Sequence, residues 1–381
     1  MKKIYPKIKE FFERADMVLF TLCLICSLFG ITAISSATKS MHSSQYVIVQ
    51  TACMFIGIAL FVLFTIVDLD IIADKWILLI GFEAFLMFLL LTPLGYADDT
   101  GNRAWLRLGV VGVQPSEVVK VSFIVVMAKH ITYLKSYKNL NSVLSIGQLA
   151  AHCLITVGAI VVISGDMGSA LVYVFVFIVM IFAGGVRLYW FLIGMAGVAA
   201  VVPVFWTKVL NQNYRNRIMV PYNSNIDPTG TGIGWQAAQS KIALANGEFW
   251  GMGYGEGMKS QSQYLPAKQT DFIFSVIGEE LGMIACIAVV ALLLAIIVRC
   301  LYIGIKSKNT MSMLVCFGVA GSMIFQTFEN ICMCIGIAPV IGITLPFFSY
   351  GGSSMFSMFA AMGLVSGVKY RPKPERFVSY R

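Results

Sequence analysis

Charged residues are scarce in this sequence: Asp, Glu, Lys and Arg make up only 12% of the 381 residues, whereas 58% are hydrophobic. Soluble domains carry about 25% charged residues. Together with a mean hydropathy of +0.81, this scarcity excludes an ordinary soluble protein. The apolar runs are also far longer than the roughly 10-residue alternating strands of a membrane barrel. We therefore predict an all-α, polytopic integral membrane protein.

Motifs for ATP-driven or metal-dependent chemistry are missing as well. The chain has no GxxxxGKS phosphate loop, no HExxH pair and no Cys/His cluster. The nine cysteines fall almost entirely within apolar runs, which is typical of small hydrophobic side chains. We therefore expect no metal site built from side chains, and the sequence indicates no particular cofactor. The net charge of +9 is concentrated at the chain ends and in short connections, so it predicts membrane anchoring and no nucleic-acid binding.

Ten apolar runs are close to the roughly 20 residues that a helix needs to cross a bilayer. They cover residues 17–37, 46–66, 77–94, 115–134, 146–164, 168–185, 188–207, 272–299, 311–335 and 347–368. The first run is too long for a cleavable signal peptide, so we expect a retained span. An even number of spans puts both termini on one side, and the Lys/Arg distribution predicts that this side is cytoplasmic. The expected parts are a basic tail over 1–16, a transmembrane domain over 17–368 and a basic tail over 369–381.

This topology places one large loop, residues 208–270, outside the cell between the seventh and eighth spans. The loop has no clear periodic structure, and loops of this length are usually functional or disordered. It combines aromatic side chains and amides with cations, whereas a disordered tract would be poor in aromatics. The cations and amides of interest are Arg215, Arg217, Gln239 and Lys241. We favour a functional loop.

Asp271 is the leading candidate for chemistry. It follows LPAKQT and stands where the large loop enters the eighth apolar run, at the expected margin of the membrane. Ionisable groups near a span are costly and are functional candidates by default. Pro266 stiffens the approach, and Thr270 is a plausible N-cap for the following helix. The alternative is that Asp271 only favours the positive end of that helix.

Two further polar stretches precede the loop. In WLRLGVVGVQPSEVVK, Glu117 and Lys120 are three residues apart on one helix face, so they form either an internal ion pair or a polar wall of an outward-facing cavity. In SGDMGS, Asp166 lies in a short outer turn, where an aspartate is common for structural reasons alone.

The stretch LPFFSYGGSS, residues 345–354, predicts a broken or kinked start to the tenth span. Pro346 and the pair Gly351–Gly352 interrupt the helical pattern. Irregular backbone at membrane depth requires protein or a water-filled cavity around it, and its N–H groups can face an anion. Close packing of small residues explains the same pattern nearly as well.

Several quoted stretches, in this order and spacing, closely resemble the SEDS family of shape, elongation, division and sporulation proteins (RodA, FtsW and SpoVE). They are WLRLGVVGVQPSEVVK, GDMGSA, QSKIALANGEFWGMGYGEG, LPAKQTDFIFSVIGEELG and FENICMCIGIAPVIGITLPFFSYGGSS. Together they cover most of residues 100–360. The chain resembles the RodA-type elongation proteins most, although ANGEFWGMGYG leans towards the division and sporulation relatives.

The resemblance implies a peptidoglycan glycosyltransferase of the bacterial plasma membrane, which polymerises lipid II beside a class B penicillin-binding protein. It implies Asp271 as the catalytic residue and inversion at the anomeric carbon. It places the family's fourth-span acid and base on Glu117 and Lys120 and its loop aspartate on Asp166. Since the pyrophosphate leaving group needs cations or N–H groups, Arg215, Arg217, Lys241 and Lys120 are candidates on the outer side. The full set predicted to bind substrate is Glu117, Lys120, Asp166, Arg215, Arg217, Gln239, Ser240, Lys241, Thr270, Ser349, Gly351 and Gly352. A divalent cation, Mg²⁺ or Mn²⁺, could share the work of these cations.

The chain departs from the family pattern at three positions. Ala267 and Gln263 replace glutamates that many members have, and Gly165 replaces a proline. A mechanism that needs a second loop carboxylate is therefore in doubt for this protein. Two other functions stay open from the residues alone: a transporter that flips the lipid-linked precursor, and a non-catalytic scaffold of a wall-synthesis complex.

Overall fold

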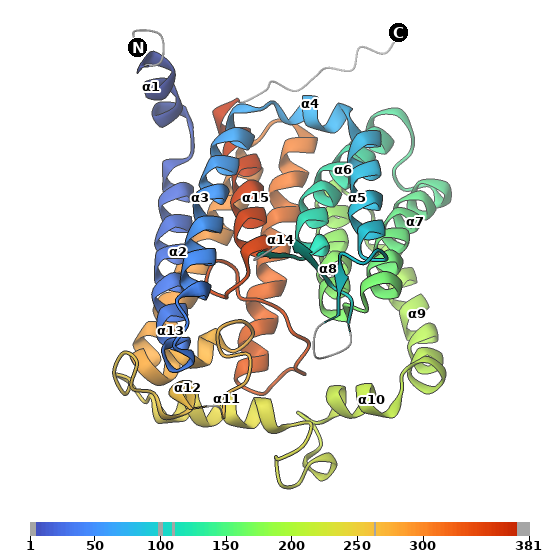
Figure 1. The fold of residues 1–381 in the computed structure, drawn as a ribbon. Coiled ribbons are helices and arrows are strands. Elements are labelled where there is room, and N and C mark those ends of the chain that lie inside the picture. The colour runs from blue at the N-terminus through green and yellow to red at the C-terminus, as the bar shows by residue number, and fades with distance from the viewer. Residues whose placement is uncertain (1–4, 98–101, 109–110, 263, 372–381) are drawn as a thin grey trace.

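The computed structural model describes residues 5–97, 102–108, 111–262 and 264–371; Gln263 and most of the C-terminal tail lie outside this part. Helices occupy all ten predicted ranges, as Figure 1 shows. They are α2 (Met17–Ala37), α3 (Gln45–Ile66), α5 (Trp76–Leu89), α6 (Pro115–Tyr137), α7 (Val143–Ala159), α8 (Met167–Gly184), α9 (Leu188–Val204), α13 (Ile273–Lys306), α14 (Thr310–Cys334) and α15 (Gly352–Tyr370). The prediction of an all-α polytopic membrane protein is confirmed.

Seven of these helices are long and apolar enough to cross a membrane on their own. They include α7, which continues through the π-helical turn η2 (Ile160–Ser164), and α9, which continues through η3 (Phe205–Val209). The helix α5 is shorter, and α6 and α15 are not among these seven. Since α6 and α15 are largely buried, neighbouring helices rather than lipid surround most of their surface.

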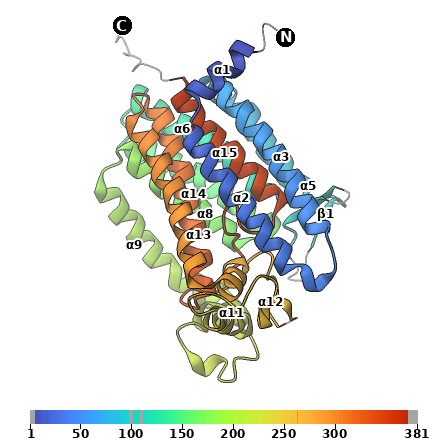
Figure 2. The ribbon, with the colours of Figure 1, turned by 90° about the vertical axis from the view of Figure 1, so that its left-hand side faces the viewer.

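The most extensive helix contact joins α3 and α15. Glycines allow this close approach: a Cβ on Gly363 would lie 2.7 Å from the carbonyl oxygen of Phe61, and one on Gly57 would lie 2.7 Å from the ring of Phe359. Small residues at such positions let two helix backbones pack closely, which is how membrane helices gain van der Waals contact. In contrast, α9 has no buried residue and lies at the edge of the bundle in both ribbon views (Figures 1 and 2).

The two ends of the bundle are different. The helix α1 (Tyr5–Arg14) and the last turn of α15 lie at one end, which we call the termini end. The helices α10 (Gln212–Met219), α11 (Trp235–Asn246) and α12 (Met258–Gln261) lie at the other, which we call the loop end (Figures 1 and 2). The expectation that residues 208–270 lack periodic structure was wrong, because three helices form there.

Short elements complete the fold. The 3-10 turns η1 (Lys39–Met41) and η4 (Ser224–Ile226) lie in the loops, and α4 (Leu69–Asp74) joins α3 to α5. Three antiparallel strands, which the sequence analysis did not predict, are β1 (Gly95–Tyr96), β2 (Trp105–Leu108) and β3 (Val111–Val113), in the order β1-β2-β3. They fill the connection between α5 and α6.

The structure differs from the predicted spans at two places near the candidate site. The eighth helix is broken at Gly282, whose φ of 79° and ψ of −179° are not helical, and it then continues to Lys306. The tenth helix begins at Gly352 and not at residue 347, so residues 336–351 form an irregular segment. The predicted break near Pro346 and Gly351 is confirmed.

All nine cysteines are buried and unpaired, as expected for hydrophobic side chains. Cys23 and Cys26 have the C-x-x-C spacing of some redox and metal sites. Both are fully buried in α2, so the spacing reflects helix packing here.

Candidate functional site

A tight turn over residues 267–272 carries Asp271. Ala267 has a φ of 48°, a conformation that is strained for a residue with a side chain. Its carbonyl oxygen accepts hydrogen bonds from the main-chain N–H groups of Thr270, at 3.1 Å, and Phe272, at 3.2 Å. The Thr270 hydroxyl also donates to this oxygen, at 3.1 Å. The prediction that Thr270 caps the next helix was therefore wrong: Phe272 occupies the N-cap position, without a side-chain cap.

Asp271 is half-buried, and its main chain is fixed from α14. The side-chain Nδ2 of Asn330, which is fully buried, donates to the carbonyl oxygen of Asp271 at 2.8 Å and to that of Ile343 at 2.7 Å. The carboxylate lies beside Gly342, because a Cβ at Gly342 would be 3.6 Å from Oδ2 of Asp271. Gly342 has a φ of 71°. The absence of a side chain there leaves room next to the carboxylate.

The 336–351 segment is joined to the same turn at its other end. The Ser349 hydroxyl donates to the carbonyl oxygen of Thr270 at 2.6 Å, and the N–H of Tyr350 donates to that of Gln269 at 2.8 Å. Gln50 of α3 supports this junction from behind: it donates to the Ser349 carbonyl at 3.1 Å and accepts from the Gly351 N–H at 3.1 Å. Ser349 and Gly351 therefore shape the turn through the backbone.

Asp166 lies at the start of α8, on the side of the 336–351 segment. It caps the helix by accepting from the Ser169 N–H at 2.8 Å, and it also accepts from the Ser169 hydroxyl at 2.6 Å and from Gln114 at 2.8 Å. A Cβ on Gly168 would lie 2.7 Å from the carbonyl oxygen of Ile341. The backbone of residues 341–343 thus contacts the start of α8 and the carboxylate of Asp271, and it brings these two predicted regions together.

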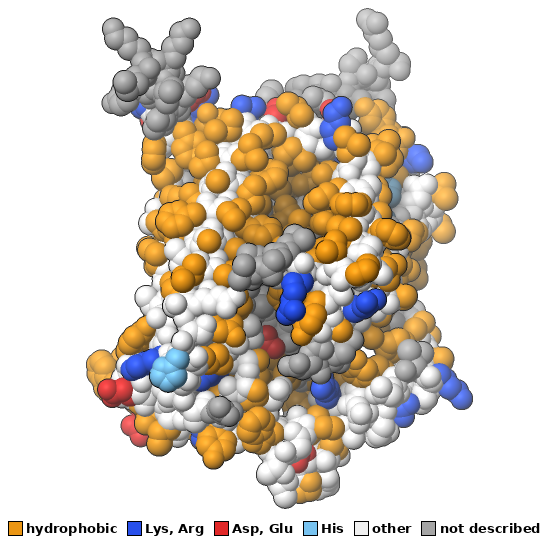
Figure 3. All heavy atoms as spheres, in the orientation of Figure 1, with side chains coloured by type: hydrophobic (Ala, Val, Ile, Leu, Met, Phe, Trp, Pro, Cys, Tyr) orange, Lys and Arg blue, Asp and Glu red, His pale blue; other side chains and the backbone are white. Residues whose placement is uncertain are grey.

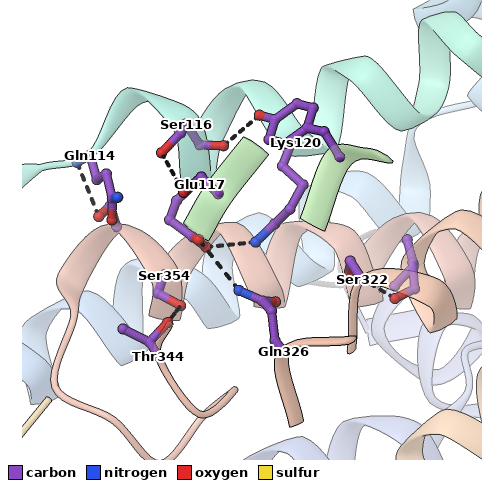
Figure 4. A network of polar contacts seen from close by, with 12 residues as sticks. Gln114, Ser116, Glu117, Lys120, Ser322, Gln326, Thr344 and Ser354 are labelled. Atoms are coloured by element: carbon purple, nitrogen blue, oxygen red, sulfur yellow. Dashed lines mark hydrogen bonds and ion pairs between the residues drawn. The ribbon is translucent and has the colours of Figure 1, made fainter. Parts of the chain in front are cut away.

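Glu117 and Lys120 form the predicted internal ion pair. The Lys120 Nζ lies 2.9 Å from Oε2 of Glu117, and the two side chains are 4% and 8% exposed. Gln326 of α14 donates to the other Glu117 oxygen at 3.4 Å (Figure 4). Figure 4 also shows this pair between α6 and the region that carries Thr344 and Ser354. The pair is thus a buried polar link, and its contact with substrate stays a prediction.

The loop residues predicted to bind substrate fall into two groups. In α11, Ser240 is fully buried and donates to the Cys334 carbonyl at 2.7 Å, so it fastens α11 to α14. Gln239 is half-buried with an unpartnered Oε1. The exposed Lys241 runs along Gly336, the first residue of the 336–351 segment, where a Cβ would lie 3.3 Å from its Nζ. Lys241 is the loop cation that the structure places against this segment.

The second group lies on α10. The Arg215 guanidinium donates to the carbonyl oxygens of Leu210, at 3.0 Å, and Thr207, at 2.9 Å. It therefore stabilises the end of the α9–η3 helix. Arg217 is exposed on the same short helix. None of these contacts joins α10 to the turn of Asp271.

A cluster of buried charged side chains, which was not predicted from the sequence, holds the loop before the turn. Glu279 accepts from the N–H groups of Lys259 and Ser260 at 2.8 and 2.7 Å, and Glu280 accepts from Gly255 N–H at 3.0 Å and from the Gln261 side chain at 2.7 Å. These carboxylates hold the loop that precedes Asp271. In the sequence, the two adjacent acidic residues of GEELG were the signal from which this cluster could have been predicted.

Lys268 belongs to the same cluster and is only 3% exposed. Its Nζ donates to the Ser40 hydroxyl at 2.8 Å and to the carbonyl of Ser260. Burial lowers the pKa of the Lys268 ammonium, while the nearby carboxylates of Glu280 and Glu279 act in the opposite direction. Lys268 thus ties the Asp271 turn to the loop after α2 and is a structural cation.

The β-sheet adds further residues that the sequence analysis did not select. Arg103 is exposed, and the Arg107 guanidinium lies 4.3 Å from the centre of the Tyr96 ring. Asn102 contacts the turn before α8, because a Cβ on Gly165 would lie 2.7 Å from its Oδ1. Asn102 therefore joins the segment before β2 to the turn that carries Asp166, and Arg103 is its neighbour in the sequence.

Figure 3 shows a hollow in the middle of the face turned to the viewer. Hydrophobic side chains surround it towards the termini end, and basic and acidic side chains appear in it towards the loop end. Among the described residues, no group of three or more His, Cys, Asp or Glu side chains is placed to hold a metal ion. These residues therefore do not provide a complete protein site for a divalent cation.

The fold and these contacts define a class of protein: a polytopic helical membrane protein with an anchored carboxylate where its large loop meets the bundle. The sequence model of the FtsW, RodA and SpoVE family, described as "Cell cycle protein", matches residues 13–373. The chain therefore belongs to this family, which is the SEDS family expected from the motifs.

Relatives and solved structures agree with this assignment. The chain is 32% identical over 370 residues to a probable peptidoglycan glycosyltransferase FtsW of Geobacter sulfurreducens, covering 95% of this chain and 96% of the relative. It is 32% identical over 277 residues to the peptidoglycan glycosyltransferase MrdB of Escherichia coli, covering 71% and 72%.

Two solved chains share the fold. One comes from a structure of a peptidoglycan synthase complex that coordinates polymerization and crosslinking, with a TM-score of 0.78, 25% identity, and 93% and 97% of the two chains covered. The other is the rod shape determining protein RodA of Thermus thermophilus, with a TM-score of 0.68, 24% identity, and 93% and 96% covered.

Proposed function

We propose that this chain is a peptidoglycan glycosyltransferase that polymerises lipid II into glycan strands, with Asp271 as the general base. Family membership and the names of the relatives support the activity. The observation that carries the assignment of Asp271 is its anchorage: Asn330 fixes its carbonyl group, and Gly342 leaves space beside its carboxylate.

The reaction joins two sugars and releases a pyrophosphate. The 4-hydroxyl of one sugar attacks the anomeric carbon of another, the new C–O bond forms, and the bond to the polyprenyl pyrophosphate breaks. Asp271 takes the hydroxyl proton as the bond forms, which is the task of a general base within hydrogen-bond reach. One displacement on an α-linked donor gives a β-linked product, so the reaction inverts the anomeric centre.

The leaving pyrophosphate needs cations or N–H groups to receive its charge. Lys241 is the best placed of the predicted cations, since it lies against the 336–351 segment. Arg103, just before β2, and Arg107 of β2 are further candidates, because Asn102 beside Arg103 contacts the turn that carries Asp166. Lys120 is less suitable, because its charge is already paired with Glu117. We assign no reaction step to a divalent cation, because the described side chains do not form a complete site for one.

The proposed setting is the bacterial plasma membrane, with both termini in the cytoplasm and the loop end outside. A class B penicillin-binding protein is the proposed partner, and the similarity to a chain of a peptidoglycan synthase complex supports it. Cysteines introduced into a cysteine-free chain test the orientation. An external reagent should label positions 228 and 259 but leave 138 and 306 unlabelled. Labelling of position 306 in intact cells would place Asp271 on the wrong side for this reaction.

Purified protein and purified lipid II test the activity directly, with and without the penicillin-binding partner. Asp271→Asn keeps the size of the side chain and removes the base, so polymerisation should fall by about 10²–10⁴ while the melting temperature is retained. Polymer formation by the Asn variant at the normal rate would remove Asp271 from the mechanism. If the protein flips lipid II but forms no polymer, the glycosyltransferase assignment is wrong and the transporter assignment takes its place.

A further inference from the structure

A second cavity lies between α5, α6 and α7, away from the turn of Asp271. Its volume is about 1130 Å³, and most of the side chains around it are hydrophobic. Phe88 of α5 and Ile155 of α7 line it and are 60% and 73% exposed. Since these helices span the membrane, the cavity opens towards lipid. A ligand can therefore enter it from the bilayer.

Polar groups line this cavity near the middle of the membrane-spanning helices. Glu83 stands halfway along α5 and is only 7% exposed, and its Oε1 accepts no hydrogen bond from the protein. Ser122 hydrogen-bonds the Glu83 carboxyl group, and its hydroxyl also donates to the carbonyl of Val119 at 2.9 Å. Oε1 of Glu83 is the oxygen that has no partner among the described residues. Burying a polar atom without a partner destabilises a protein. An intramembrane carboxyl group in this state indicates a missing partner.

A histidine pair also lines the cavity. The Nδ1 atoms of His130 and His152 are 3.4 Å apart, and Nε2 of His152 is buried without a hydrogen-bond partner. Both histidines line the cavity together with Glu83. The cavity thus contains two polar atoms without a hydrogen-bond partner among the described residues, Oε1 of Glu83 and Nε2 of His152, and most of its other lining side chains are hydrophobic.

The shape and polarity of the cavity restrict the occupant. The volume of about 1130 Å³ exceeds the roughly 300–1,000 Å³ of typical small-molecule pockets, which gives room for long hydrocarbon chains. Lys129 and Lys138 also line the cavity, and Lys129 pairs with Asp74 at the termini end. At the depth of Glu83, however, a phosphate or ammonium group would be expensive to bury. A hydroxyl group is neutral and can donate to Glu83, and the apolar walls suit hydrocarbon chains.

We propose that this cavity binds an uncharged membrane lipid with a free hydroxyl group, which hydrogen-bonds Glu83 while its chains lie along α5 and α7. The hydroxyl can come from a diacylglycerol or from a polyisoprenoid alcohol. This proposal does not depend on the polymerase activity, because no residue of the Asp271 site contributes to the cavity.

Photolabelling of the full-length protein in phospholipid nanodiscs tests the proposal. The probe is a dioleoylglycerol with a diazirine on one acyl chain, and labelled peptides are located by mass spectrometry. Label should appear on α5 and α7. Unlabelled dioleoylglycerol should compete for it, whereas triolein, which has the same chains and no free hydroxyl, should not. Stronger competition by farnesol than by dioleoylglycerol would support the proposal and assign the hydroxyl to a polyisoprenoid.

Three variants make the test specific. Glu83→Leu should lower labelling about tenfold through loss of a buried hydrogen bond, and Ala151→Phe should lower it by filling the cavity. Phe82→Leu changes a neighbouring residue of α5 that does not line the cavity, so labelling should be unchanged. If Glu83→Leu does not fold, the Ala151→Phe variant and the triolein competition still test the proposal. Equal competition by triolein, or a normal signal in a folded Glu83→Leu or Ala151→Phe variant, would overturn the proposal.

Discussion

The side-chain amide of Asn330 joins Asp271 to the irregular 336–351 segment: Nδ2 lies 2.8 Å from the carbonyl oxygen of Asp271 and 2.7 Å from that of Ile343. These two carbonyls belong to segments about 70 positions apart in the sequence. One buried side chain on α14 therefore sets the distance between the proposed base and the backbone around Gly342. Asn330 is a positioning residue in this view, because it contacts Asp271 only through the main chain.

Asn330→Ala should slow polymerisation more than it weakens lipid II binding. Both carbonyls lose their donor, and a base displaced by about 1 Å can cost roughly 10²-fold in rate. Steady-state kinetics should show a lower kcat with little change in KM, and the pH profile of the remaining activity should also change. Ser322→Ala, on the same helix, is the control, because Ser322 bonds only to its own helix at Val319. An equal effect of both variants would assign Asn330 a purely structural role.

Glu117 and Lys120 should show strong coupling in stability. Neutralising one partner of a buried ion pair leaves an uncompensated charge and typically costs about 3–5 kcal/mol. The variants Glu117→Gln and Lys120→Met should therefore each lower the melting temperature in detergent, and the double variant should be milder than the sum. If both single variants keep their stability but bind lipid II less tightly, the pair contacts substrate. Additive losses would show that the two charges act independently.

Gly282→Ala should loosen the loop that precedes Asp271. Gly282 has a φ of 79°, and a Cβ there would lie 2.4 Å from the Phe249 carbonyl oxygen and 2.5 Å from the Gly251 nitrogen. Strained backbone of this kind costs about 1–3 kcal/mol, and the clash with backbone adds to it. Limited proteolysis should cut residues 247–262 faster than in the parent protein. Gly194→Ala of α9, where a Cβ meets no atom within 4 Å, should leave the digestion pattern unchanged; similar cutting in both variants would contradict the prediction.

Asp16 should stabilise the termini end in a pH-dependent way. It is fully buried and pairs with Arg299 at 2.7 Å and Lys369 at 3.2 Å. Burial raises the pKa of the Asp16 carboxyl, but the hydrogen bonds from Arg299 and Leu19 and the charge of Lys369 outweigh it, so the pKa lies below the ordinary 3.8. The stabilisation is therefore complete above pH 3.8 and is lost as the pH falls through the lowered value.

The variant Asp16→Asn tests this direction of the pH dependence. Its melting temperature in detergent should be lower than that of the parent protein at neutral pH, and the gap should narrow only in strongly acidic buffer. A gap that widens on acidification, or no gap at neutral pH, would show that Asp16 does not contribute in this way. Glu13→Gln is a suitable control, since Glu13 forms only an exposed pair with Lys9 and exposed pairs contribute little.

The ten apolar runs, the break near Pro346 and the Glu117–Lys120 pair could all be predicted from the sequence. Each depends on local properties: the length of an apolar run, a proline beside paired glycines, and a spacing of three residues on one helix face. The motifs also led to the correct family. These features need no knowledge of which helices are neighbours.

Only the tertiary structure decided how the candidate site is assembled. Asn330 and Gln50 act on the Asp271 turn and its neighbours from helices that are distant in sequence, and no local pattern reports such contacts. The same holds for Gly282, where a loop backbone excludes any side chain, and for Ser240, whose burial follows from the packing of α11 on α14. The sequence by itself determined which segments cross the membrane because lipid acts on each segment separately. Tertiary packing decided the site because its hydrogen bonds join segments that only folding brings together.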